Sequence, residues 1–102
     1  MKTLIQLQKQ LDEIAQKYEK PYWEPMACLG ALIEEVGEVA RILNHKYGDK
    51  PKKPGEQHEQ LSKELADVIV SVFYIANREG IVLDQPVQAS ISKLETRDKD
   101  RF

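Results

Sequence analysis

Apolar residues recur at steps of three and four along four segments of the chain, the spacing that places side chains on one face of an α-helix. The first stripe consists of Leu4, Leu7, Leu11, Ile14 and Tyr18. We predict that this helix ends before Pro21, because the residue that precedes a proline avoids the helical conformation. The second helix is predicted to begin near Pro25, a residue suited to the first helical turn, and to end at Gly48. Its apolar positions are Leu29, Leu32, Val36, Val39 and Leu43.

The third predicted helix extends from about residue 56 to residue 79 and follows a loop, 48–55, rich in proline, glycine and lysine. Its apolar stripe consists of Leu61, Leu65, Val68, Val72 and Ile75. The β-branched stretch 68–73 favours a strand if taken alone, but the flanking helical period and the lack of a partner strand favour a helix. Gly80 ends this helix, and Asp84 is predicted to cap a fourth one. Val87, Ile91 and Leu94 are predicted to face inward from this fourth helix.

These elements predict an all-α fold, an antiparallel bundle of about four helices that forms a single domain over residues 1–102. A chain of 102 residues has a small core, because little surface is buried per residue at this length. We therefore expect a homo-oligomer, either a homodimer or a homotetramer.

The composition excludes several classes of protein. The chain has 15 basic and 17 acidic residues and a formal net charge of -2, whereas dedicated nucleic-acid binders usually carry a strong basic excess. Its apolar runs are too short to span a membrane, and its first residues lack the apolar core of a signal peptide. Cys28 is the one cysteine, which excludes an intramolecular disulfide. We expect a cytoplasmic protein that binds neither nucleic acid nor a membrane.

Two pairs of acidic residues lie within the predicted central helices. Glu35 and Glu38 are three residues apart on the second helix, and residues with this spacing share a helix face. Glu64 and Asp67 have the same spacing on the third helix. If the two helices pack antiparallel, the pairs can face each other, and four carboxylates in one place repel unless a cation joins them. The alternative is that these acids only solvate helix surfaces.

The sequence around the acidic pairs favours a site over a solvated surface. Both pairs are embedded in apolar sequence, and Gly37, inside the first pair, costs about 0.5–1 kcal/mol in a helix interior. Neither His45 nor His58 follows a glutamate by three positions, so the sequence lacks the Glu-x-x-His motif of di-iron bundles. A ligand set of oxygens favours Mg²⁺ or Mn²⁺ over iron or zinc. Mg²⁺ sites of this kind typically bind phosphate-bearing substrates.

The acidic segments LIEEVGEVA (32–40) and ELADVI (64–69) together resemble the paired motif of the MazG-type nucleoside triphosphate pyrophosphohydrolases, an all-α superfamily. The stretches 44–53 and 96–102 resemble a small single-domain branch of it. The resemblance implies that a (d)NTP is hydrolysed to the monophosphate and pyrophosphate, in a role that clears surplus or aberrant nucleotides. It also implies ligands for Mg²⁺, with Mn²⁺ as a substitute, at Glu35, Glu38, Glu64 and Asp67.

Further roles follow from this resemblance. Glu34 or Glu38 is expected to help take the proton of the attacking water. The chain departs from the family pattern at Lys63, where relatives often carry an acid, and at Arg97, where some relatives carry asparagine. We expect the change at Lys63 to matter little, whereas the change at Arg97 affects a predicted substrate contact.

Substrate contacts are predicted at five residues, each with a structural alternative. Lys93 and Arg97 are predicted to bind the triphosphate, and the alternative is a solvated helix end. Trp23 either stacks on the base or anchors the chain before the second helix. Lys46 is predicted to lie at the rim of the nucleotide site. Asn77 either reads the base or ribose, or makes a hydrogen bond between helices.

Two other functions stay open on the sequence alone. Phosphoribosyl-ATP pyrophosphohydrolases belong to the same superfamily and have a similar length, although the segment 46–53 and the tail favour the MazG-like branch. The other alternative is a non-catalytic helical association module whose acids only solvate its surface.

Overall fold

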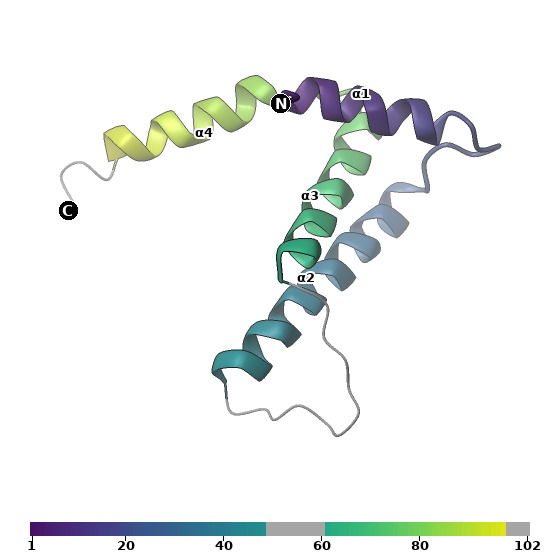
Figure 1. Ribbon diagram of the computed structural model, residues 1–102. Helices are drawn as coiled ribbons and strands as arrows, with labels where there is room; N and C mark the ends of the chain where they lie inside the picture. Colours follow the sequence, from purple (N-terminus) through teal and green to yellow (C-terminus); the bar gives the residue numbers. More distant parts are fainter. Residues whose placement is uncertain (49–60, 98–102) are drawn as a thin grey trace. The chain divides into compact units, whose positions relative to one another are not determined.

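The computed structural model describes residues 1–48 and 61–97, which form four α-helices and no strand (Figure 1). The helices are α1 (Leu4–Ala15), α2 (Pro25–Tyr47), α3 (Leu61–Arg78) and α4 (Asp84–Arg97). The all-α prediction is therefore confirmed for this part of the chain. Most of the predicted loop, 49–55, and the predicted helical residues 56–60 lie outside the described residues. None of the described helices is long and apolar enough to cross a membrane.

The ends of the helices follow signals in the sequence. As predicted, α2 begins at Pro25 and is closed by Gly48, whose N–H completes the last helical turn. Gly80 follows α3 with a φ of 73°, a left-handed conformation that glycine adopts without steric cost. By contrast, α1 ends at Ala15, so the last apolar position of its predicted stripe, Tyr18, lies beyond the helix.

The chain divides into two compact units, one formed by Tyr22–Ile75 and the other by Met1–Pro21 with Ala76–Phe102. In the first unit, α2 and α3 pack antiparallel. Tyr22, just before α2, makes an edge-to-face ring pair with Tyr74, late in α3, with ring centroids 6.0 Å apart. Farther along α2, Glu35 lies beside Glu64, early in α3. From the first of these contacts to the second, the position moves toward the C-terminus of α2 but toward the N-terminus of α3. The two helices therefore run in opposite directions, as predicted.

The described residues bury few large side chains. The buried apolar residues are Ala15, Cys28, Phe73 and Ala76. Many large apolar side chains of α2 and α3 are exposed, namely Met26, Leu29, Ile33, Val36, Leu43, Leu65, Ile69 and Val70. Exposed apolar side chains that gather in contiguous patches mark sites of association.

In the second unit, Gln8 connects α1 to the end of α3 and to the segment that follows it. Gln8 is only 4% exposed. Its amide nitrogen donates to Asn77 Oδ1 at 3.0 Å and to the carbonyl of Ile81 at 2.8 Å. Its amide oxygen accepts from the backbone N–H of Leu83 at 2.9 Å, and Asn77 Nδ2 donates to the backbone carbonyl of Gln8 at 3.0 Å. These partners offset the cost of burying the Gln8 amide, about 1–3 kcal/mol for each polar group left unpaired.

Asp84 links the starts of two helices within the same unit. It is predicted to be the N-cap of α4, but the helix already begins with Asp84, which therefore lies one position farther into the helix. Its Oδ2 accepts a hydrogen bond of 2.9 Å from the backbone N–H of Ile5, in the first turn of α1. A carboxylate at this position is favoured because the N-terminal end of a helix carries a partial positive charge. Thr3 and Gln6 complete the start of α1 with a capping box.

The apolar stripe of α4 differs from the expectation. It is predicted to face inward, yet Val87 is 39%, Ile91 51% and Leu94 45% exposed, and α4 has no buried residue. The spacing of these residues is correct for one face of a helix, but spacing does not specify which surface covers that face.

Candidate metal centre

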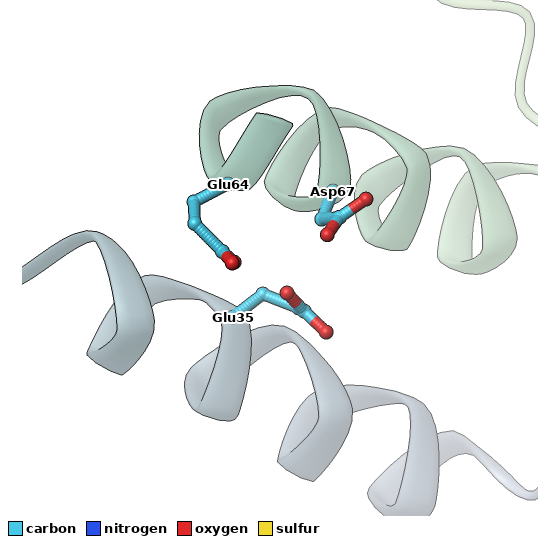
Figure 2. Close-up of side chains that lie close together, drawn as sticks. All are labelled: Glu35, Glu64 and Asp67. Carbon is cyan, nitrogen blue, oxygen red and sulfur yellow. The ribbon is translucent and has the colours of Figure 1, made fainter. Parts of the chain in front are cut away.

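Three carboxylates meet between α2 and α3 (Figure 2). Glu35 extends from α2 toward Glu64 and Asp67 of α3, and one oxygen of each residue lies within 4.8 Å of the other two. Glu64 is 5% exposed, and Glu35 and Asp67 are half-buried. Carboxylates this close together repel one another, and a cation between them removes the repulsion.

Helical spacing and antiparallel packing together produce this carboxylate cluster, which consists of Glu35, Glu64 and Asp67. Glu64 and Asp67 are three residues apart, so both project from the face of α3 that lies toward α2. Glu35 meets them from the middle of α2. The sequence names these residues as candidates, and the packing of the two helices brings them together.

Lys63 supplies a positive charge beside the carboxylate cluster. Its Nζ donates a hydrogen bond of 3.1 Å to Asp67 Oδ2, in an ion pair between residues four apart on α3. The side chains of Lys63 and Asp67 are 58% and 38% exposed, so water screens the pair and its contribution to stability is small.

The other two predicted acids lie near the carboxylate cluster but are not part of it. The side chain of Glu38 is 52% exposed, and its carboxylate lies 4.0 Å from the guanidinium of Arg41. Three residues advance a helix by about 4.5 Å, so Glu38 is displaced along α2 from Glu35. Glu34 is also exposed. The structure thus brings together three of the four predicted ligands and leaves Glu38 beside them.

The carboxylate cluster fits a hard divalent cation. Oxygens that bind one Mg²⁺ at about 2.1 Å are about 3–4 Å apart, depending on whether they are adjacent or opposite. The cluster oxygens lie at most 4.8 Å apart, close to this range, and glutamate side-chain torsions can close a difference of this size. All three donors are carboxylate oxygens, the ligand type that Mg²⁺ and Mn²⁺ prefer.

The predicted base and rim contacts lie far along α2 from the carboxylate cluster. Trp23 is 61% exposed and precedes α2, and Pro25 is ten residues before Glu35, which corresponds to about 15 Å of helix. Lys46 is eleven residues after Glu35, or about 16 Å, and its Nζ lies 5.3 Å from the ring centroid of Tyr47. Both residues are therefore well separated from Glu35 along the chain.

The three remaining substrate candidates belong to the other unit. Lys93 and Arg97 are exposed on α4, with Arg97 in its last turn. Both polar atoms of the Asn77 amide are engaged with Gln8, which agrees with the alternative of a hydrogen bond between helices. The contact of Asn77 with a nucleotide stays a prediction.

The role of Gln8 was not predicted, although the sequence contains a signal for it. Gln8 follows Leu4 by four residues and precedes Leu11 by three, so it occupies the apolar stripe of α1. A polar residue at such a position is expected to be buried with hydrogen-bond partners. Its partners could not be identified, because they lie more than sixty residues away in the sequence.

Comparison with known proteins identifies the family. Residues 24–102 match the model of the MazG nucleotide pyrophosphohydrolase domain. The uncharacterized protein YpjD of Bacillus subtilis (strain 168) is 37% identical over 101 residues, which cover 99% of this chain and 91% of that protein. Mouse dCTP pyrophosphatase 1 is 32% identical over 85 residues, 80% of this chain and 48% of that protein, so the match spans about half of the mouse enzyme.

A solved structure agrees with the sequence matches. The crystal structure of the Bacillus-conserved MazG protein, a nucleotide pyrophosphohydrolase, superposes with a TM-score of 0.79 and 33% identity. The match covers 98% of this chain and 97% of that structure. Together with the family match over residues 24–102, this agreement shows that the chain belongs to the MazG nucleotide pyrophosphohydrolase family.

Proposed function

We propose that the protein is a Mg²⁺-dependent nucleotide pyrophosphohydrolase that converts a (d)NTP into a (d)NMP and pyrophosphate. The observation that carries the proposal is the meeting of Glu35, Glu64 and Asp67 between α2 and α3. Membership of the MazG family and similarity to a dCTP pyrophosphatase support the reaction. The biological role that we propose is removal of surplus or aberrant nucleotides.

In this proposal the three residues of the carboxylate cluster hold the cation, and Glu38 joins them by rotation of its exposed side chain. The bound cation supplies neutralisation of phosphate charge and activation of water. Burial of Glu64 fixes one ligand in place, because a buried side chain has few accessible rotamers. Glu34 or Glu38 accepts the proton of the attacking water, since both carboxylates are exposed next to the cluster on α2.

The substrate contacts are part of the same proposal. Lys93 and Arg97 bind phosphate oxygens, and the planar guanidinium of Arg97 can make two parallel hydrogen bonds to one phosphate. Trp23 and Lys46 contact parts of the nucleotide remote from the cation, which is consistent with their separation from Glu35 along α2. Asn77 is the weakest candidate, because its amide is already engaged with Gln8.

We also propose that the whole chain acts as one domain and assembles into a cytoplasmic homodimer or homotetramer without nucleic-acid or membrane partners. The exposed apolar side chains of α2 and α3 support self-association, because a second copy can cover them. The exposed stripe of α4 gives further apolar surface of the same kind.

A turnover screen tests the proposal and separates it from its alternatives. The purified chain is incubated with each of the eight standard (d)NTPs, with oxidised and methylated nucleotides and with phosphoribosyl-ATP, with Mg²⁺ or with a chelator, and pyrophosphate is measured. We expect Mg²⁺-dependent release from at least one (d)NTP and its loss in Glu64→Gln, while Glu13→Gln, on the exposed part of α1, stays active. Release from phosphoribosyl-ATP alone would favour the related enzyme, and an inactive protein that binds no Mg²⁺ would favour the association module.

A further inference from the structure

A second apolar face of α2 lies on the side of this helix away from α3. Its members recur at alternating steps of three and four residues, and the large ones are 39–75% exposed. We call this face the α2 seam, and it consists of Met26, Leu29, Ile33, Val36, Ala40, Leu43 and Tyr47. Ile33 is about 160° around the helix from Glu35, which extends toward α3 (Figure 2). Alternation of this kind is the pattern by which one helix packs along another.

Two glycines flank the α2 seam without a reason within the described chain. Gly30 and Gly37 each follow a seam residue, and glycine is less favourable than alanine in a helix interior. A Cβ atom at either position would meet nothing within 4 Å, and neither glycine has a positive φ. Glycine also allows another backbone to come close. The two positions therefore indicate a second helix that packs tightly along the seam.

The length of the α2 seam indicates which helix fits it. From Met26 to Tyr47 the seam extends for about 32 Å, at 1.5 Å per residue. Among the described helices, α1 has 12 and α4 has 14 residues, which are too few, and α3 already packs against the opposite face of α2. The 23 residues of α2 itself match this length. A second copy of α2 therefore covers the seam from end to end.

The exposed area of the α2 seam is sufficient for a stable dimer. The exposed fractions of its six large residues together amount to more than three whole residues. This corresponds to roughly 500–650 Å² per copy and roughly 1,000–1,300 Å² for a pair, which reaches the size of a specific interface. The seam residues and the two glycines carry no charge, so the same surface on a second copy meets them without unpaired charges.

From these observations we propose that the α2 seams of two copies pack antiparallel, with Leu29 of one copy against Ala40 of the other and Ile33 against Val36. The inference rests on the assembly in the proposed function, because it assigns the surface and the direction of that association. In this alignment Gly30 of one copy lies beside the second glycine of the other copy, so the backbones can approach closely.

Complementary sizes favour this direction. Antiparallel pairing places a large residue, Leu29, against a small one, Ala40, as close packing requires. It also brings each helix end beside the oppositely charged end of the other helix. A parallel pair would instead place Ala40 against Ala40 and leave a gap at the centre of the interface.

The test exchanges the large and the small residue. Ala40→Leu puts two leucines where one fits, so we expect association, measured by sedimentation over a concentration series, to weaken at least tenfold. Ala40 is exposed in the single chain, so its helix can accept the larger side chain, and circular dichroism checks the fold. Leu29→Ala combined with Ala40→Leu restores a large–small pair and should return association to within about threefold of the wild type. Ala27→Leu, exposed on α2 outside the seam, is the matched control and should change nothing.

The outcomes separate this inference from the proposed function. If the wild type associates and Ala40→Leu associates equally well, the seam is wrong and the proposed assembly stands. Stronger association of Ala40→Leu would overturn the antiparallel direction, and failure of the double variant to recover would overturn the pairing of Leu29 with Ala40. A monomeric wild type overturns both the seam and the assembly. A wild type that associates as expected but hydrolyses no nucleotide overturns the proposed reaction and leaves the seam in place.

Discussion

Replacing Glu35 by glutamine should make the order of stability of wild type and variant depend on Mg²⁺. Glu35 faces Glu64 and Asp67 with oxygens at most 4.8 Å apart. At this distance each pair of charges repels by about 1 kcal/mol in water and by about 3.5 kcal/mol at the effective dielectric constant near a protein surface. Glutamine keeps the size of the side chain and removes the charge. Without metal, the variant should therefore match the wild type or exceed its free energy of unfolding by about 1–2 kcal/mol, after allowance for screening.

With saturating Mg²⁺ the order should invert. A ligand that binds only the folded state stabilises it by about 2.7 kcal/mol at one hundred times its dissociation constant. The wild type should gain this amount, whereas the variant, which lacks one ligand, should gain much less. It should also lose Mg²⁺-dependent pyrophosphate release.

Urea unfolding followed by circular dichroism, with Mg²⁺ or with a chelator, measures both effects on the same sample. The exposed Glu13→Gln on α1 is the matched control and should follow the wild type in both conditions. The reasoning would be refuted if Glu35→Gln were clearly less stable than the wild type in the chelator, or if both proteins gained equally from Mg²⁺.

Three further predictions concern other parts of the chain. Gln8→Ala should lower the free energy of unfolding by about 2–4 kcal/mol, because the N–H of Leu83, the carbonyl of Ile81 and Oδ1 of Asn77 lose a hydrogen-bond partner. Urea unfolding, with the exposed Gln10→Ala as the control, measures this change, and equal stability of the two variants would contradict the prediction. Sedimentation should show a dimer or tetramer of the wild type at micromolar concentration. Ile33→Glu, which places a charge on the exposed apolar surface of α2, should shift the protein toward the monomer. A monomeric wild type would refute the proposed assembly. Arg97→Ala should raise KM for the nucleotide about tenfold while Mg²⁺ affinity measured by calorimetry stays constant; an unchanged KM would remove Arg97 from the substrate site.

Local signals were sufficient to predict most of the helical elements. The proline that begins α2 and the glycines that follow α2 and α3 act within one or two residues of the helix ends, so their effect is readable without any knowledge of packing. The spacing of Glu64 and Asp67 likewise fixes a shared helix face. Antiparallel packing of neighbouring helices was then enough to predict that acids of the second helix meet this face.

Features that depend on exact packing could not be predicted. A shift of one helical turn along α2 decides whether Glu38 or Glu35 faces the acids of α3, and one turn is only about 5.4 Å. The partnership of Gln8 with Asn77 joins residues 69 positions apart, and no local pattern records it. The stripe of Val87, Ile91 and Leu94 identifies an apolar face of α4 but not the surface that covers it.

The central claim is that Glu35, Glu64 and Asp67 bind a divalent cation, and diffraction from a crystal containing Mn²⁺ and a non-hydrolysable (d)NTP analogue tests it most directly. We predict an anomalous difference peak between α2 and α3, within coordination distance of all three carboxylates and of a phosphate oxygen. An ordered nucleotide with the manganese bound elsewhere, and these three carboxylates in contact with solvent alone, would contradict the account.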